Sequence, residues 1–339
     1  MNDLPNVENN QSMKKVFSRI GLAYFIMLAL DVLFSRLIGV YFHKAGITDP
    51  NSWLTYLSSM IPLWGIGFPV CLLILKGIQK ISPEEHNIKA FNLVKTYLSL
   101  TAVMILGNII GIITSSIVGK IAGGNLTNTT MNMISEQELL PSFLFAVIFG
   151  PIMEELAFRK VLLDCAGKYS KKYAIILSGI MFGLFHLNLF QFFYAAALGM
   201  VFAYIYLSSG KIRYTICLHC LVNFIHGIIP VAILKHMDIQ SLQEVSGMNP
   251  TDPEVQKKAL ALYSNPAFLL FILYGMMIFT FIVLGIIIFF THRKNITLDN
   301  TGAPIQKENA FPVIYLNIGM ILFLLGTIGV SIYQIILQL

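Results

Sequence analysis

The stretch AFLLFILYGMMIFTFIVLGIIIFFT, residues 267–291, carries no charged side chain and is long enough to cross a bilayer as one helix. Similar apolar stretches run along the rest of the chain, at 19–42, 54–75, 93–118, 142–163, 173–188, 190–208, 213–234 and 312–337. The stretch 173–188 is short, and its boundary with the next stretch is weakly marked. We therefore expect an all-α fold, a polytopic transmembrane helical bundle of about eight or nine spans.

The composition supports the same fold class. Of 339 residues, 56% are hydrophobic and 12% are charged, and the mean hydropathy is +0.73. Soluble domains carry roughly twice that share of charge, so a soluble globular protein, a disordered chain and a disulfide scaffold are excluded. The net charge of +6 comes without a clustered basic face, and we expect no nucleic-acid partner. The expected location is the cell membrane, with the lipid bilayer as the surrounding phase.

The distribution of lysine and arginine predicts the orientation. No small-residue cleavage site follows the first apolar run, so we expect a retained first span after a cytoplasmic tail, 1–18. With the N-terminus inside and nine spans, the cytoplasmic segments hold most of the basic residues, namely Lys14, Lys15, Lys76, Lys80, Lys89, Lys160, Lys168, Lys171, Lys172, Lys211, Arg213, Arg293, Lys294 and Lys307. The outer segments hold Lys44, Lys120, Lys235, Lys257 and Lys258. This asymmetry favours a cytoplasmic N-terminus and an outer C-terminus.

The polar motifs all lie in a central core at 140–235. This core is preceded by N-terminal helices at 19–118 and followed by C-terminal helices at 267–339. Two long outer loops, 119–141 and 235–266, separate these parts. In the second loop, Thr251-Asp252-Pro253-Glu254 is typical of a helix start, with a capping side chain, an early proline and an acid in the first turn. We expect a short surface helix there.

The first polar cluster lies in the fourth span. Glu154 and Glu155 are adjacent carboxylates in an apolar context, and ionisable groups within a membrane are expensive enough to suggest a function. Glu155 and Arg159 are four residues apart and share a helix face, so they can form an ion pair. Glu154 then has no cation on its own helix and is expected to face a cavity or another helix. The alternative is that both acids serve helix packing alone.

Two further clusters follow on later spans. His186 ends the stretch Phe182-Gly183-Leu184-Phe185-His186, and a lone histidine of this kind is often a satisfied core residue. His219 and Asn223 are four residues apart, and His226 lies seven beyond His219, so the three form a polar stripe. An interhelical hydrogen-bond set would explain the stripe equally well.

The three clusters can converge because they lie at overlapping depths. At about 1.5 Å per residue, Glu154 and His186 lie roughly 15–20 Å from the cytoplasmic turn that joins their spans, and His219 lies about 10 Å from its own. One carboxylate and two imidazoles around a pocket can activate water and stabilise an oxyanion, or bind a divalent metal.

The motifs Glu154-Glu155-Leu156-Ala157-Phe158-Arg159, Phe182-Gly183-Leu184-Phe185-His186 and His219-Cys220-Leu221-Val222-Asn223 resemble those of one family. It is the CPBP family of intramembrane proteases, which comprises CAAX prenyl proteases and bacteriocin-processing enzymes and is also called the Abi family. The resemblance covers roughly 140–235.

The resemblance implies an α-helical intramembrane endopeptidase that hydrolyses membrane-associated or peptide substrates, some of them lipidated. It implies that Glu154 and His186 activate water, that His219 and Asn223 stabilise the oxyanion, and that Glu155 and Arg159 support the site.

The family has been described both with and without a metal. Because no HExxH pair shares a helix, we expect no firmly bound cofactor. If the protein is metal-dependent, a divalent ion such as zinc would be held by Glu154, His186 and His219.

Other functions stay open. A non-catalytic membrane immunity or regulatory scaffold would need no such convergence of polar groups. A proton- or ion-coupled transporter would also use intramembrane acids and histidines, but no inverted repeat is visible. A cysteine nucleophile is disfavoured, because Cys217 precedes the polar stripe and Cys220 is rotated about 100° from it.

Overall fold

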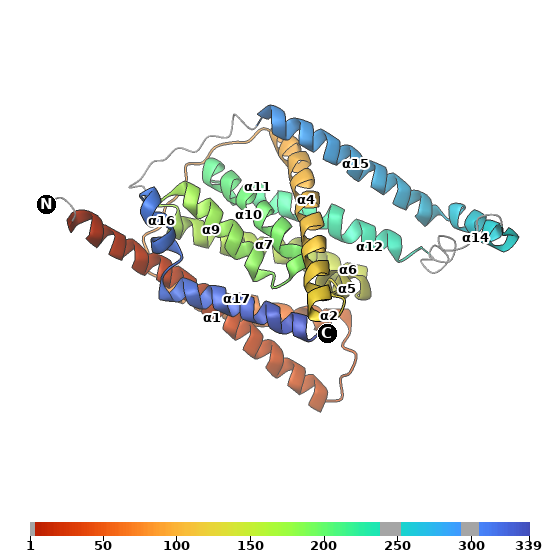
Figure 1. Cartoon of the computed structure of the whole chain (residues 1–339), viewed down its shortest axis with the longest axis horizontal. Coiled ribbons are helices and arrows are strands. Elements are labelled where there is room, and N and C mark those ends of the chain that lie inside the picture. The colour runs from red at the N-terminus through yellow and green to blue at the C-terminus, as the bar shows by residue number, and fades with distance from the viewer. Residues whose placement is uncertain (1–3, 238–251, 293–304) are drawn as a thin grey trace.

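The computed structural model describes residues 4–237, 252–292 and 305–339, and every regular element in these ranges is helical (Figure 1). Within them, eight helices are long and apolar enough to cross a membrane. They are Asn10–Lys44, Ser52–Leu75, Ala90–Ala122, Leu139–Ala166, Leu189–Ser209, Ile212–Leu234, Pro266–His292 and Ile318–Ile336. The predicted all-α polytopic fold is confirmed.

Several spans are built from more than one helical segment. The first is α1 (Leu4–Lys44), the third α4 (Ala90–Ala122), the fifth of the eight α10 (Leu189–Ser209), and the seventh α15 (Pro266–His292). The second joins α2 (Ser52–Met60), the π-helical η1 (Ile61–Gly67) and α3 (Phe68–Leu75). The fourth joins α6 (Leu139–Ser142), η2 (Phe143–Phe149), α7 (Gly150–Glu155), η3 (Leu156–Val161) and α8 (Leu162–Ala166). The sixth joins α11 (Ile212–Asn223), η4 (Phe224–Ile228) and α12 (Ile229–Leu234).

The short apolar stretch at 173–188, whose boundary is weakly marked in the sequence, forms α9 (Lys171–Phe185), a helix of 15 residues. At about 1.5 Å per residue it is about 22 Å long, which is short for a hydrocarbon core of about 30 Å. It nevertheless packs closely on α10, because Gly179 and Gly183 have no side chain to separate the helices. A Cβ on Gly183 would lie 2.8 Å from the Phe192 carbonyl oxygen, and one on Gly179 would lie 2.6 Å from that of Ala196.

The first and last helices lie side by side and run in the same direction (Figure 1). At one end, the Gly319 amide of α17 (Ile318–Ile336) donates to the Ser18 hydroxyl at 3.0 Å. At the other, the Arg36 guanidinium lies 4.9 Å from the centroid of the Tyr333 ring. Because successive spans alternate in direction, this parallel pairing requires an odd number of passes. Among the described helices, α9 is therefore the additional pass beside the eight long ones.

Two helix boundaries differ from the predicted apolar stretches. The helix that carries the first span extends back from residue 19 to Leu4 and buries Met13 and Phe17. The last span does not begin at residue 312. A short α16 (Lys307–Ile314), with a proline inside it, ends before a new helix start at Asn317, whose side chain caps α17 by accepting from the Met320 amide.

The two long loops each contain a helix. In the first, α5 (Thr129–Glu136) begins at Asn128, whose side chain accepts from the Met131 amide. In the second, the predicted surface helix is present as α14 (Pro253–Tyr263), with the Asp252 side chain as its cap. Three residues used in the sequence argument, Thr251, Arg293 and Lys294, lie outside the described residues. Which face of the bundle is cytoplasmic stays a prediction.

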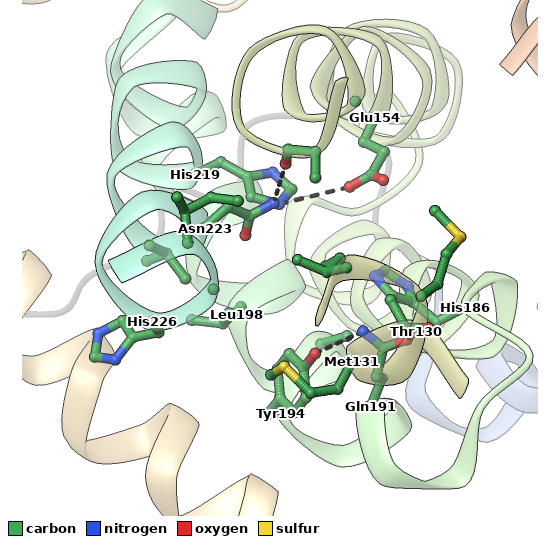
Figure 2. A pocket seen from close by; sticks show the side chains of 18 of the residues that line it. Thr130, Met131, Glu154, His186, Gln191, Tyr194, Leu198, His219, Asn223 and His226 are labelled. Carbon is green, nitrogen blue, oxygen red and sulfur yellow. Dashed lines mark hydrogen bonds and ion pairs between the residues drawn. The ribbon is translucent and has the colours of Figure 1, made fainter. Parts of the chain in front are cut away.

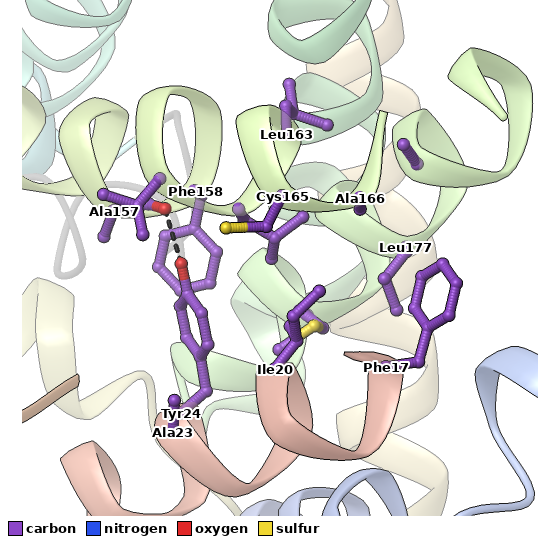
Figure 3. Close-up of a cluster of buried hydrophobic side chains, with 14 of the residues drawn as sticks. Phe17, Ile20, Ala23, Tyr24, Ala157, Phe158, Leu163, Cys165, Ala166 and Leu177 are labelled. Atoms are coloured by element: carbon purple, nitrogen blue, oxygen red, sulfur yellow. Dashed lines mark hydrogen bonds between the residues drawn. The ribbon is translucent and has the colours of Figure 1, made fainter. Parts of the chain in front are cut away.

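The core that supports the site lies between α1, η3 and α9 (Figure 3). Tyr24 of α1 is buried against Phe158, and its hydroxyl donates to the Ala157 carbonyl at 2.5 Å. The Ser178 hydroxyl of α9 donates to the Phe158 carbonyl at 2.8 Å. A π-helical turn changes the backbone ladder, and these side chains provide extra donors to two of its carbonyl groups. This packing fixes η3, which carries Arg159.

Candidate active site

The two adjacent acids end α7 at the point where the helix widens into η3. Such π-helical turns are frequent at functional sites because they change the directions in which neighbouring side chains point. Glu155 is fully buried, whereas the Glu154 side chain is 26% exposed. The two carboxylates therefore lie in different environments although they are consecutive in the chain.

Glu155 and Arg159 form the ion pair that their spacing predicts. The Arg159 Nε atom lies 3.1 Å from Glu155 Oε2, and both side chains have 0% exposure. The guanidinium also lies 4.4 Å from the ring centroid of Phe182 and 5.5 Å from that of Phe202, a cation–π arrangement. Isolated charges do not persist in such surroundings, so each group depends on the other.

His219 lies between the two carboxylates. Its Nδ1 atom is 2.9 Å from Glu155 Oε1, and its Nε2 atom is 3.5 Å from Glu154 Oε2. Its ring packs against Phe182 and Phe202, with centroids 5.8 and 5.3 Å away. The Arg159–Glu155–His219–Glu154 chain thus runs from a fully buried cation to a partly exposed carboxylate, and each member restrains the orientation of the next.

His186 caps the end of α9. Its Nδ1 atom lies 2.9 Å from the Phe182 carbonyl oxygen, and its ring makes an edge contact with the Phe182 ring at 4.7 Å. Because a carbonyl only accepts, Nδ1 carries the proton of this hydrogen bond. In the neutral imidazole the other nitrogen, Nε2, then has a free lone pair. Leu187 follows with φ of 54°, a left-handed backbone conformation that turns the chain sharply into α10.

Asn223 ends α11. Its Nδ2 group donates to the Ala146 carbonyl of η2 at 2.9 Å, which ties α11 to the fourth span. A side-chain amide has two N–H donors, so one donor of Asn223 is left after this bond.

These groups share one cavity of about 340 Å³, within the range of small-molecule and peptide side-chain sites. Figure 2 shows Glu154 and His186 on one side of it, with His219 and Asn223 facing them from α11. The cavity thus collects all four residues to which the sequence assigned chemistry, while Glu155 and Arg159 lie behind it. In the described residues, no hydrogen bond or ion pair joins Glu154 to His186, and Glu154 instead contacts His219.

The site does not fit a metal centre. Across the parts of the chain that the structure describes, no three His, Cys, Asp or Glu side chains are grouped so that they could hold an ion. The conditional ligand set of Glu154, His186 and His219 is not arranged as a ligand shell, and we derive no step through a metal.

Several lining residues carried no catalytic or ligand role in the sequence argument. Polar ones include Tyr56, Asn108, Asn128, Thr130, Gln191, Tyr194 and His226, and apolar ones include Met60, Met104, Met131 and Met133. His226 continues the predicted stripe, but its Nε2 atom lies 3.2 Å from the Tyr97 hydroxyl, outside the catalytic group. All four cysteines are free, and neither Cys217 nor Cys220 lines the cavity. The sequence analysis treated ionisable side chains within the spans as functional candidates. Applied to amide side chains as well, the same criterion would have identified Asn108.

Comparison with known proteins supports the predicted resemblance. Residues 136–225, which include all six predicted site residues, match the family model described as Type II CAAX prenyl endopeptidase Rce1-like. This match and the two relatives named below support the resemblance to the CPBP family of membrane proteases. It is 26% identical over 227 residues to a Bacillus subtilis (strain 168) protein named "Putative membrane peptidase YdiL", covering 62% of this chain and 87% of that one.

A second relative is the Staphylococcus aureus (strain USA300) protein named "Membrane-embedded CAAX protease MroQ". It is 29% identical over 158 residues, which cover 44% of this chain and 62% of that protein. No solved structure matches this chain. The family match begins after α1 to α4 and ends before α14, α15 and α17, so these outer helices lie beyond the matched region.

Proposed function

We propose that this protein is an intramembrane endopeptidase that hydrolyses peptide bonds with a water molecule activated by Glu154 and His186. The observation that carries the proposal is the Arg159–Glu155–His219–Glu154 chain, which ends in the cavity that also receives His186. An ion pair that only stabilises the fold would not require a partly exposed carboxylate, Glu154, and the imidazoles of His186 and His219 in the same cavity. The family match to CAAX endopeptidases supports the same chemistry.

The first step is proton removal from water. Glu154 is the partly exposed carboxylate of the cavity and accepts the proton, and the free Nε2 lone pair of His186 accepts the second hydrogen bond of the same water. The oxygen then adds to the carbonyl carbon of the substrate, whose oxygen becomes an oxyanion. The Glu154 proton finally moves to the leaving amine as the C–N bond breaks.

The oxyanion needs donors that are already in place. His219 is held on Glu155 through Nδ1, and its Nε2 edge, 3.5 Å from Glu154 Oε2, lines the cavity, where an N–H on that edge would donate to the oxyanion. Asn223, one turn further along α11, keeps one N–H beside its bond to Ala146 and lines the same cavity. Held donors of this kind stabilise the developing charge without having to reorganise.

The cavity favours an internal peptide bond over a chain end. Among the described residues, none of those that line it is lysine or arginine, so no cation is present to bind the C-terminal carboxylate of a short peptide. The four methionines supply flexible apolar surface for substrate side chains of different shapes. These features support hydrolysis within membrane-associated peptides, including lipidated ones.

The test is mass-spectrometric cleavage of a peptide pool that includes lipidated peptides. Purified wild type, Glu154→Gln and the matched control Glu136→Gln, an exposed glutamate on α5, are compared with and without a chelator. We expect cleavage by wild type and by the control, and a loss of at least about 100-fold in Glu154→Gln. Cleavage by Glu154→Gln at the wild-type rate would refute the mechanism. Sensitivity to the chelator would show that a metal takes part, against the donor geometry.

A further inference from the structure

Asn108 of α4 is a polar side chain that faces the catalytic cavity from outside the family-matched region. Three nearby residues of the same helix, Leu106, Ile109 and Ile110, are exposed apolar residues suited to lipid. Asn108 thus lies on the cavity wall, whereas these residues form the lipid-facing surface of the same helix.

Among the described residues, the side-chain amide of Asn108 has no hydrogen-bond partner. Every other polar side chain that lines the cavity has at least one hydrogen bond or ion pair, namely those of Tyr56, Asn128, Thr130, Glu154, His186, Gln191, Tyr194, His219, Asn223 and His226. No described residue bonds the side chain of Asn108. An unpaired amide in a membrane helix is unfavourable, and an apolar residue of similar size would avoid this penalty. The amide is thus free to bond a molecule that enters the cavity.

The backbone that carries Asn108 is held firmly. The preceding residue, Gly107, lies so close to α10 that a Cβ on it would be 2.7 Å from the Tyr194 Cα atom. On α10, the Gln191 side chain donates to the Tyr194 hydroxyl at 2.8 Å and accepts from the Thr130 hydroxyl at 2.9 Å. At this point α4 and α10 are in close backbone contact, and the wall that they form is distinct from the α7 and α11 segments that carry the proposed chemistry.

We propose that Asn108 hydrogen-bonds the main chain of the substrate and so anchors an extended peptide in the cavity. A side-chain amide offers one carbonyl acceptor and two N–H donors, which match the N–H and C=O groups of a peptide. The contact is neutral and carries no preference for a charged side chain, which suits substrates of varied sequence. This inference rests on the proposed peptidase function and adds a substrate-positioning residue to it.

Steady-state kinetics of Asn108→Leu supply the first test. Loss of one such bond should raise KM about three- to tenfold and leave kcat within about twofold, since the reacting groups are untouched. Thermal stability should be unchanged or higher, because an unpaired polar group has been removed. A role in folding would lower stability instead. An unchanged KM would overturn the proposal.

Ser115→Ala is the matched control. Ser115 lies seven residues further along α4, on the same face, and its buried hydroxyl has no partner among the described residues, yet it does not line the cavity. This variant should keep the wild-type KM. An equal rise in KM for Ser115→Ala and Asn108→Leu would show that the effect comes from helix packing, and would overturn the proposal.

Binding without turnover separates this inference from the proposed function. The Glu154→Gln protein in lipid nanodiscs is incubated with the synthetic peptide pool, and retained peptides are identified by mass spectrometry. Adding Asn108→Leu should lower retention about three- to tenfold. N-methylation of one backbone amide in a retained peptide should reduce its binding to Glu154→Gln but not to the double variant. The proposed contact between Asn108 and the peptide would be overturned if both variants retained equal amounts of peptide, or if Glu154→Gln retained none. Either result would count against the contact independently of whether the wild type cleaves peptides.

Discussion

Replacing Glu155 by glutamine should strongly destabilise the protein. Glu155 and Arg159 are both fully buried and lie 3.1 Å apart, so the substitution leaves a guanidinium without a counterion. Removing one member of a buried pair costs about 3–5 kcal/mol. The cation–π contacts of Arg159 with Phe182 and Phe202 are already present in the wild type, so they do not compensate for the lost counterion.

Double variants separate the charge effect from the effect on His219. With Glu155→Leu and Arg159→Met, no charge is left unpaired, so we expect the free energy of unfolding to return to within about 1 kcal/mol of wild type. His219 Nδ1 then lacks the acceptor that lies at 2.9 Å, and turnover should stay low. With Glu155→Gln and Arg159→Met, the glutamine carbonyl can accept from His219, and part of the turnover should return.

The assay is unfolding in mixed micelles by titration with a denaturing detergent, followed by peptide cleavage on the same preparations. The reasoning is refuted if Glu155→Gln alone costs less than about 1 kcal/mol, since a buried unpaired charge cannot be that cheap. It is also refuted if the Leu/Met pair keeps wild-type turnover, because the orientation of His219 would then be irrelevant.

Three smaller perturbations follow. Asn223→Leu should lower kcat about 100- to 1,000-fold, as loss of an oxyanion donor does, and an unchanged kcat in the cleavage assay would remove Asn223 from the mechanism. Gly183→Ala should destabilise by about 1–3 kcal/mol because its Cβ would lie 2.8 Å from a backbone oxygen, and unfolding at wild-type detergent concentration would contradict the α9–α10 packing. Tyr24→Phe should cost about 1–3 kcal/mol in the same unfolding titration by removing the donor to the Ala157 carbonyl, with no change in KM.

The parts of the site that depend on local spacing could be predicted from the sequence. The Glu155–Arg159 pair follows from four residues of separation, and the structure confirms it although η3 is π-helical. The convergence of Glu154, His186 and His219 on one cavity follows from comparable depths along successive spans. The catalytic roles assigned to these residues stay predictions.

What depends on tertiary packing could not be predicted. The position of His219 between two consecutive carboxylates requires α11 to approach α7 at a particular rotation, and no periodicity encodes that rotation. Asn108 reaches the cavity because Gly107 lets α4 lie close to α10, a contact between residues 87 positions apart. The break before Asn317 was missed because the apolar run continues across it, so hydropathy alone hides the new helix start.

The parallel pairing of α1 and α17 has a consequence for biogenesis. The Ser18 surface of α1 is covered by Gly319, about 300 positions later in the chain, so it stays uncovered while the catalytic core is being synthesised and inserted. Contacts of such long sequence separation form late and are slow to form. The bundle should therefore mature in two stages, with the core assembling first and α17 docking afterwards. During that interval the Ser18 surface of α1 would be accessible to insertion factors and to quality-control proteases.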